Sequence, residues 1–302
     1  MYIVDMHCDS LLTVSGEQGF VNNYNFSNKY PQLQFAAEFV PKRDGAPEAR
    51  RARIKELCNA YLYECERLFL PRIMSGKDVF DAEARGGRSV LLSIEGGGGL
   101  FADSPELDVL YGAGLCVLGM AWDDNELSAS AWTRNDYGLT EAGVALAKRC
   151  ADMGIVLDVS HLSDKAFYDT LEVCPMPLLA THSNFREVTP SARNLTLDMA
   201  KKIVARGGVI GLNLYPDFLA ESGADTDDIL RHVDYALENL GENALGFGFD
   251  IDGTSGQYPR GITASHSIHE QVIDLLLSHY SYSVVERIAG LNVLDFLKNN
   301  LF

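Results

Sequence analysis

The sequence predicts a (β/α)8 barrel. Short apolar, β-branched runs recur eight times, and most are separated by segments long enough for a helix. Nearly continuous apolar strands are typical of a parallel sheet that is covered on both faces, and eight repeats indicate a closed barrel. A doubly wound sheet is the alternative. No Pro/Gly/Ser-rich linker or low-complexity tract divides the 302 residues, so we expect one α/β domain over residues 1–302.

The expected strands are the eight apolar runs. They are residues 2–7, 33–40, 89–95, 115–122, 154–161, 178–182, 208–214 and 244–250. Helical patterns cover residues 48–70, 138–153, 163–174 and 197–206, with Pro47 suiting a helix start and Ser163 an N-cap. The C-terminal stretch from about residue 267 to 302 has the pattern of two or three amphipathic helices.

Two connections lack a helical pattern. Residues 10–32 are rich in Asn, Tyr and Phe, which predicts a loop or an abbreviated helix, and residues 253–265 carry three glycines and a proline, which predicts a loop after the eighth strand. Loops at this position carry specificity in barrels.

The composition excludes several classes of partner. The 25 Lys and Arg against 42 Asp and Glu give a formal net charge of −17, which repels nucleic-acid phosphates and anionic membranes. We find no run of 18 apolar residues and no leader pattern at the N-terminus, so we expect a cytoplasmic protein. The six cysteines include no CxxC pair, and we expect them to be reduced.

Metal-ligand side chains stand at the C-terminal ends of five expected strands. His7 and Asp9 follow the first strand, and the later strands end in Glu95, His161, His182 and Asp250. Residues two apart in an extended chain share a face, so His7 and Asp9 point the same way. The C-terminal ends of barrel strands converge on one face, where active sites form. We therefore expect all six side chains in one pocket.

This set of side chains indicates a pair of metal ions. Three histidines and two or three carboxylates exceed the needs of one four-coordinate site, whereas two metals bridged by a carboxylate would use them all. Imidazole and carboxylate together suit zinc best, with manganese or iron as alternatives. The constellation predicts a binuclear hydrolase.

Several motifs resemble the signatures of the membrane (renal) dipeptidase family of metallopeptidases. They are DMHCDSLL, LLSIEGG, LDVSH, His182-Ser183-Asn184, Arg193-Asn194, GFGFDIDG and GLNVLDFL, in family order over nearly the whole chain. The resemblance implies a TIM-barrel zinc dipeptidase of the amidohydrolase type. It further implies cleavage of dipeptides with tolerance for a D-residue at the C-terminal position, and an enzyme that is often a homodimer.

The resemblance also implies roles for the metal-ligand residues. By it, Glu95 would bridge two zinc ions, one held by His7 and Asp9 and the other by His161 and His182. A hydroxide between the zinc ions would be the nucleophile, which explains why no serine or cysteine nucleophile is needed.

The substrate residues implied by the resemblance would recognise both ends of a dipeptide. Arg193 would clamp the C-terminal carboxylate, while Asp250 would bind the ammonium and shuttle a proton to the leaving amine. Tyr215 matches a substrate-pocket tyrosine of the family. A dipeptide fits between Asp250 and Arg193, so we expect substrates with free N- and C-termini.

The sequence departs from the family pattern at one substrate position. Trp122 stands where mammalian members carry a histidine near the reacting carbonyl, and it could narrow the side-chain pocket, with Asp123, Asp124 or Asn125 as other candidates to line the site. This departure and residues 10–32 leave open a binuclear amidohydrolase acting on an N-acyl amino acid or a lactone. A non-catalytic binding barrel is a third alternative.

Other residues have alternative interpretations. Arg193 could instead pair with Asp198 on the surface, and Asp252 could replace Asp250 as the participating acid. Cys8 should point away from the metals and be buried. We expect the remaining histidines, which have no nearby ligand set, to lie on the surface: His232, His266, His269 and His279.

Overall fold

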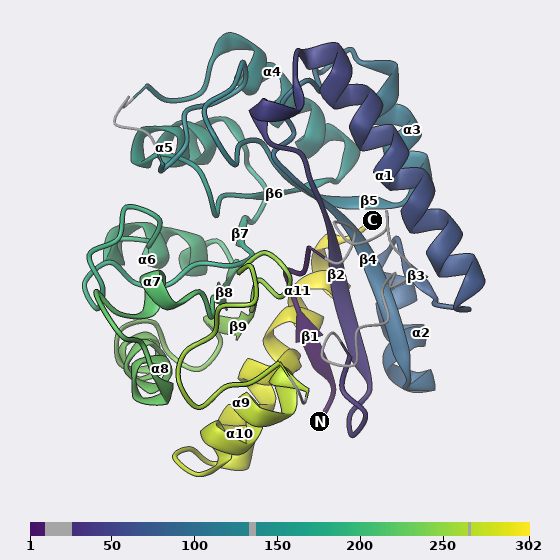
Figure 1. The fold of residues 1–302 in the computed structure, drawn as a ribbon. Helices are drawn as coiled ribbons and strands as arrows, with labels where there is room; N and C mark the ends of the chain where they lie inside the picture. The colour runs from purple at the N-terminus through teal and green to yellow at the C-terminus, as the bar shows by residue number, and fades with distance from the viewer. Residues whose placement is uncertain (10–25, 133–136, 265–266) are drawn as a thin grey trace.

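Eight parallel strands close into a barrel in the computed structural model, which describes residues 1–9, 26–132, 137–264 and 267–302 (Figure 1). The strands pair in the order β1, β2, β4, β5, β6, β7, β8, β9 and back to β1. Their bounds are β1 (Ile3–Asp5), β2 (Gln32–Phe39), β4 (Arg88–Glu95), β5 (Leu115–Gly119), β6 (Val156–Asp158), β7 (Leu179–Ala180), β8 (Val209–Leu212) and β9 (Leu245–Phe247). The predicted (β/α)8 barrel is confirmed.

One additional strand was not predicted. The two residues of β3 (Arg72–Ile73) pair with the start of β4, opposite Val90 and Leu91. Farther along β4, the same edge pairs with β5. Two strands therefore share one edge of β4, and β3 adds to the barrel without opening it.

Helices surround the barrel, and Ser163 caps one of them as predicted, accepting a hydrogen bond from the Ala166 amide. The predicted helices correspond, within a few residues, to α1 (Pro47–Arg67), α4 (Glu141–Met153), α5 (Asp164–Val173) and α6 (Leu197–Ala205). The C-terminal part forms α9 (Ile268–Leu277), α10 (Tyr282–Glu286), the π-helical turn η3 (Arg287–Leu291) and α11 (Asn292–Asn300). Elements without a specific prediction are η2 (Lys42–Asp44), α2 (Gly76–Arg85), α3 (Pro105–Ala113), α7 (Pro216–Leu219) and α8 (Thr226–Leu240).

Most of the first predicted loop, residues 10–25, lies outside the described residues, as does His266. The described remainder, residues 26–32, contains no helix. The loop predicted after the eighth strand begins as expected, because no helix or strand lies within the described residues 253–264.

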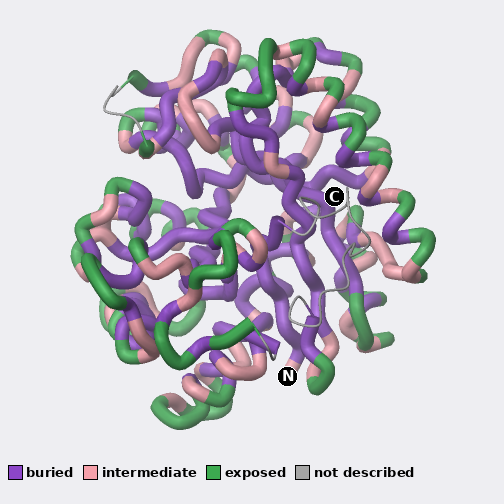
Figure 2. The backbone as a smooth tube through the Cα atoms, viewed as in Figure 1, coloured by how far each residue is buried: buried purple, intermediate pink, exposed green. Residues whose placement is uncertain are grey.

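Two apolar clusters hold the fold together. One takes side chains from seven of the eight barrel strands and from α11, so it fills the barrel interior and its N-terminal end. The other packs the outer faces of strands against the surrounding helices. Buried backbone accordingly runs through the centre of the molecule, while exposed residues lie on the outer helices (Figure 2). This frame fixes the strand ends that carry the site.

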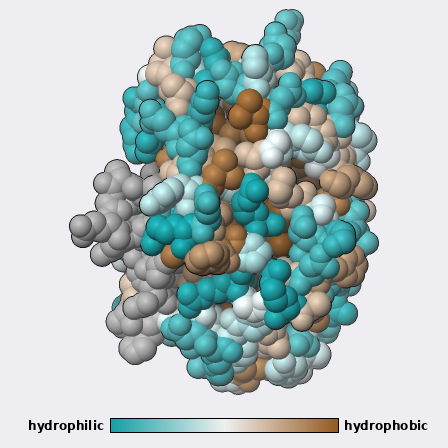
Figure 3. Space-filling model, turned by 90° about the vertical axis from the view of Figure 1, so that its right-hand side faces the viewer, coloured by the Kyte–Doolittle hydropathy of each residue, from teal (hydrophilic) through white to brown (hydrophobic). Residues whose placement is uncertain are grey.

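The surface is mixed in character. The side that lies on the right of Figure 1 shows hydrophilic residues over most of its area, with hydrophobic residues in small groups (Figure 3). Among the described residues, no helix combines the length and the apolar character needed to cross a bilayer. All six cysteines are buried, and no disulfide joins any of them.

Candidate metal centre

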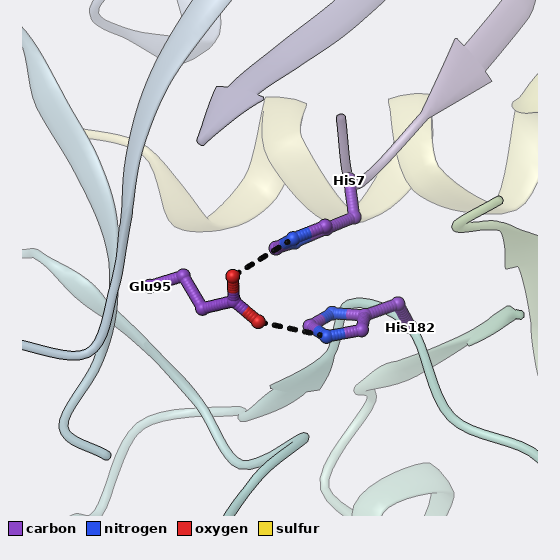
Figure 4. A group of neighbouring side chains, drawn as sticks. All are labelled: His7, Glu95 and His182. Carbon is purple, nitrogen blue, oxygen red and sulfur yellow. Dashed lines mark ion pairs between the residues drawn. The ribbon is translucent and has the colours of Figure 1, made fainter. Parts of the chain in front are cut away.

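The carboxylate of Glu95, the last residue of β4, lies between histidines from distant strands. Its Oε2 is 3.6 Å from His7 Nε2, and its Oε1 is 3.2 Å from His182 Nε2 (Figure 4). His161 follows β6, and its Nε2 is 2.6 Å from the same Oε1. The structure thus brings the four side chains together at the C-terminal face of the barrel, where the sequence predicted them.

Two aspartates complete the cluster on the side of β1 and β9. His7 Nε2 lies 3.8 Å from Asp9 Oδ1. Candidate ligand atoms of His7, Asp9 and Asp250 lie within 4.8 Å of one another, and so do those of His7, Glu95 and His182. Five of the six side chains are more than nine-tenths buried, and the sixth, Asp250, is partly exposed. The two groups overlap at His7.

The donor set fits divalent metal ions. His7 Nε2 and Asp9 Oδ1 are buried and have no hydrogen-bond partner among the described residues. His161 Nε2 and His182 Nε2 are 2.8 Å apart, and both point at the same oxygen of Glu95. Buried polar atoms without partners are costly, and converging acceptors need a cation between them. These side chains could therefore hold two metal ions.

The pKa values of the acids in the cluster follow from its crowded charges. Burial and the nearby Glu95 raise the pKa of Asp9 well above its usual range. Burial also raises the pKa of Asp250, to about 6, although His7 opposes the shift. Burial acts in the same direction on Glu95, but His7 and His161 outweigh it and hold its pKa well below the usual range. Of the three acids, Glu95 therefore stays ionised to the lowest pH.

The same buried charges shift the pKa values of the three histidines in different directions. Burial alone would lower the pKa of His7, but Glu95 and Asp9 outweigh burial and raise it to about 10. Burial and Arg193 lower the pKa of His161 to about 4. Burial, followed by His7 and Arg193, takes the pKa of His182 well below 6.5. His161 and His182 are therefore neutral near pH 7, the state in which imidazole binds metals.

A buried relay orients His182, and the sequence analysis did not identify it. The Thr181 hydroxyl donates to Asp158 Oδ2 at 2.5 Å, so it can only accept from His182 Nδ1, 2.8 Å away. This arrangement places the proton on Nδ1 and leaves Nε2 with a free lone pair for a metal. Ser160 also donates to Asp158, at 2.6 Å, and accepts from the His182 amide at 3.1 Å. The only sequence signal is that Asp158 precedes His161 by three residues in LDVSH.

A second buried network supports the end of β1. Asp5 Oδ1 accepts from the amides of His7, at 3.2 Å, and Phe249, at 3.1 Å. Its Oδ2 lies 2.8 Å from His269 Nε2 on α9. The prediction of a surface position for His269 is wrong, because this side chain is fully buried against Asp5. Asp5 thus links the backbone of His7 to that of Phe249, the residue before Asp250.

His232 was also predicted wrongly as a surface residue. It is fully buried, where its Nδ1 accepts from the Phe185 amide at 3.3 Å and its Nε2 lies 3.2 Å from the Leu219 carbonyl oxygen. His279 is exposed, as predicted. The buried Cys8 belongs to the outer apolar cluster.

Arg193 lies beside the metal-ligand residues and is only 2% exposed. Its Nη2 is 3.1 Å from His161 Nε2 and donates to the His182 carbonyl at 2.9 Å, while its Nη1 donates to the carbonyl of Ser160. The alternative pairing with Asp198 is wrong, because that carboxylate bonds Tyr168 and Lys202 instead.

A cavity of about 360 Å³ opens beside four side chains of the cluster, Asp9, Glu95, His161 and Asp250, and Arg193 is not among its lining residues. Its walls combine acidic and aromatic side chains, and the ring centroids of Trp122 and Trp132 lie 6.2 and 6.3 Å from that of His161. The lining residues are Asp9, Phe39, Arg43, Glu95, Trp122, Trp132, His161, Tyr215, Phe218, Asp250, Asp252, Gly253 and Ser255. Trp122 and Tyr215 therefore lie where the sequence predicted, whereas Phe39, Arg43, Trp132 and Phe218 were not singled out.

The other candidates after β5 do not line this cavity. Asp123 accepts from the Lys42 amide, Asp124 accepts from the Ser130 amide, and the buried Asn125 bonds backbone atoms of its own loop. Asp252 lines the cavity together with Asp250, so the lining alone does not decide which of the two acids takes part in the reaction. Asn213 donates to Asp250 Oδ2 at 3.1 Å and so orients Asp250 in the site.

The backbone after β9 is shaped to bring two acids close to the metal-ligand residues. Asp250 adopts a positive φ of 61°, which is uncommon for a residue with a side chain. A Cβ atom at Gly253 would lie 2.1 Å from Asp250 Oδ1 and 2.3 Å from Asp9 Oδ2. Only glycine leaves room for the two carboxylates here.

The sequence is similar to known proteins over most of its length. The family model described as Membrane dipeptidase (Peptidase family M19) matches residues 1–300. An uncharacterized protein in the pqqA 5' region of Klebsiella pneumoniae is 32% identical over 223 residues, which are 70% of this chain and 82% of that protein.

Two solved structures share the fold over the whole chain. The dipeptidase AC, a metallo peptidase of family M19, superposes with a TM-score of 0.88 at 26% identity, covering 100% of this chain and 99% of that one. A metallo peptidase from Rhodobacter sphaeroides, liganded with a phosphinate mimic of the dipeptide L-Ala-D-Ala, gives a TM-score of 0.86 at 24% identity over 100% and 99%.

Fold and site together define a metal-dependent hydrolase built on a (β/α)8 barrel. The chain belongs to the membrane dipeptidase family, Peptidase family M19. It is an enzyme, a binuclear metallohydrolase of the membrane dipeptidase type.

Proposed function

We propose that this enzyme hydrolyses dipeptides whose N- and C-termini are both free, including dipeptides with a D-residue at the C-terminal position. The observation that carries the proposal is the convergence of histidines and carboxylates from five strands beneath a cavity of about 360 Å³. This volume is near the lower end for small-molecule sites, which suits a substrate of two residues.

We further propose zinc as the metal, with manganese or iron as alternatives. One ion would be held by His7 and Asp9, the other by His161 and His182, with Glu95 bridging them. Two zinc ions would supply a bridging hydroxide at neutral pH and polarise the scissile carbonyl. The unpartnered atoms of His7 and Asp9 support this assignment.

The ends of the substrate are assigned to two charged groups. Asp250 would bind the ammonium, held in place by Asn213. Asp250 would also accept a proton and pass it to the leaving amine. Arg193 would clamp the C-terminal carboxylate. Its Nη2 faces the lone pair of His161 Nε2. A metal ion bound to that nitrogen would use this lone pair, so the guanidinium N–H would be free to donate to the substrate. Tyr215 and Trp122 would bound the side-chain pocket.

A substrate panel tests the proposal. The zinc-loaded enzyme should hydrolyse L,L- and L,D-dipeptides but neither tripeptides nor N-acetylated dipeptides, because both charged ends are needed to place the carbonyl. The L,D set is included because the Rhodobacter sphaeroides protein was liganded with a mimic of L-Ala-D-Ala. Cleavage of N-acyl amino acids or lactones in place of free dipeptides would contradict the proposal. Arg193→Ala should lose most of kcat/KM on dipeptides.

Metal analysis tests the ligands independently of turnover. His7→Ala should bind roughly one metal ion fewer and lose at least about 100-fold in activity while the barrel stays folded. The exposed His279 offers the matched control, since His279→Ala should retain both metals. A His7→Ala protein with two metals and full activity would refute the assignment. The homodimer and the cytoplasmic location stay predictions. Analytical ultracentrifugation would test the homodimer.

A further inference from the structure

Arg43 brings a positive charge to a cavity that is otherwise acidic. Four carboxylates line the cavity, and Arg43 is the one arginine or lysine among the described residues that line it. In the binding mode proposed above, the ammonium of the dipeptide would bind Asp250 and its terminal carboxylate would bind Arg193. The charge of Arg43 is therefore available for a third group on the substrate.

The backbone of Arg43 is fixed to the rim of the site. It lies in the short turn η2, directly after β2, where the Val40 amide donates to the Glu95 carbonyl at 3.0 Å. One residue before Arg43, the Lys42 amide donates to the Asp123 carboxylate at 3.0 Å. Arg43 thus stands near the ends of β2, β4 and β5, and backbone hydrogen bonds hold the residues on its N-terminal side.

The guanidinium of Arg43 is held by rings and has no ion pair within the described part of the chain. Its central carbon lies 5.7 Å from the Phe39 ring centroid and 5.8 Å from that of Trp122. Stacking on rings leaves the planar N–H edge free to donate. The next arginines along the chain differ, because Arg50 and Arg53 each pair with a glutamate.

We propose that Arg43 selects dipeptides that carry an aspartate or glutamate side chain. This inference rests on the proposed dipeptidase function and specifies its substrate class. A side-chain carboxylate that reaches the rim would accept from the guanidinium, while its methylene groups pack on Phe39 and Trp122. The aromatic wall extends to Trp132, whose ring centroid lies 6.2 Å from that of Trp122, so the apolar part of the side chain has a continuous surface to lie on.

Isosteric substrate pairs measure the selectivity directly. The zinc-loaded enzyme is assayed on Ala-Glu against Ala-Gln and on Glu-Ala against Gln-Ala, which differ only by acid and amide. For at least one pair, the acid should be favoured about five- to tenfold in kcat/KM, mostly through KM, as expected for a partly exposed charged hydrogen bond.

The variants assign that preference to one side chain. Arg43→Gln should abolish the preference for the acid and leave the rate on the amide substrates nearly unchanged. The matched control is Lys42→Gln, which removes the same charge from the adjacent exposed residue, outside the cavity lining, and should keep the preference. Arg43→Glu should reverse the preference, so that a lysine side chain is favoured over its neutral counterpart.

The outcomes separate the two proposals. If dipeptides are cleaved but wild type does not distinguish acid from amide, or Arg43→Gln retains the preference, the role of Arg43 is refuted and the dipeptidase proposal stands. An equal loss on acid and amide substrates in Arg43→Gln also refutes it, since that result would place the terminal carboxylate at Arg43. If no free dipeptide is cleaved, the dipeptidase proposal itself fails.

Discussion

Thr181 is the residue on which the orientation of His182 depends. Its hydroxyl donates to Asp158 and accepts from His182, and all three side chains are buried. A hydroxyl in this position fixes the orientation of the His182 ring and keeps the ring proton on Nδ1. Nε2 then has the free lone pair that a metal ligand requires.

Thr181→Val should therefore weaken metal binding or activity about 10- to 100-fold, because valine keeps the shape of threonine and removes the hydroxyl. Metal affinity is measured by competition with a chromophoric chelator. Thr181→Ser restores the hydroxyl and should recover most of the affinity. Equal metal affinity of Thr181→Val and wild type would mean that the relay does not position His182.

Glu38 is a buried acid with no role in the proposed chemistry. It lies on β2, it is fully buried, and neither carboxylate oxygen has a hydrogen-bond partner in the part of the chain that the structure describes. Burial raises its pKa well above the usual range, and the charge of Arg53 opposes this only in part.

Glu38→Gln should make the protein more stable at pH 8 than wild type but change little at pH 4. Because the folded-state pKa is raised, the unfolded chain releases the proton first as pH rises through about 4.3, the pKa of an unperturbed glutamate. Stability then falls by up to about 1.4 kcal/mol per pH unit until the folded-state pKa is passed. Urea unfolding of the two metal-free proteins across this range measures the difference. The exposed Glu221→Gln serves as control, and an unchanged difference from pH 4 to 8 would contradict the interpretation.

Single residues were predictable from the sequence only where their type and their place at a strand end coincided. His7, Glu95 and His161 fulfilled both conditions. His269 did not, because its partner Asp5 lies 264 positions away and the pattern of α9 does not reveal which partner its buried face meets. Thr181 and Asp158 were missed because serine, threonine and aspartate at strand ends are common, and only side-chain geometry reveals the relay.

At the scale of elements, the loop after β9 sets the distance between two acids. Gly253 approaches both Asp9 and Asp250 too closely for a side chain. Gly253→Ala should displace these carboxylates and lower kcat/KM by about 100-fold, with a smaller loss of stability, because catalysis is sensitive to displacements of about 1 Å. Activity and thermal unfolding are measured together.

The control for this substitution is Gly112→Ala in α3, where an added Cβ meets no atom within 4 Å. The control should keep full activity. If Gly253→Ala were as active as Gly112→Ala, the loop would have room to move. The close approach of Gly253 to the two carboxylates would then not matter for activity.

The strands were predicted well as elements and the helices less completely. Most barrel strands are apolar runs that are buried on both faces and can be recognised in the sequence, whereas β2 also carries Gln32, Gln34 and Glu38. The unpredicted β3 contains only two residues and is defined by its pairing with β4. No local sequence pattern indicates such a pairing. Helix α8 combines an acidic start with a buried face, and its capping box at Asp225 and Asp228 could have revealed it.

For the whole molecule, metal ions should act as cross-links between strands. The proposed ligands come from the ends of β1, β4, β6 and β7, which lie on different sides of the barrel. Ions that bind only the folded chain stabilise it by mass action.

Removing the metals with a chelator should lower the midpoint of thermal unfolding by about 5 to 15 °C, and added zinc should restore it. His7→Ala should show a smaller response to zinc than wild type. An unfolding midpoint that does not change with chelator would show that the barrel closes without help from the site.

The network of Asp5 with α9 also has a consequence for the order of synthesis. His7 leaves the ribosome long before His269, yet the His7 amide is held by Asp5, which lies 264 positions before its partner His269. Strand β1 also pairs with β9. The nascent polypeptide therefore cannot complete its metal centre until most of the chain has been translated, so fragments released early should neither retain zinc nor cleave peptides in the cell.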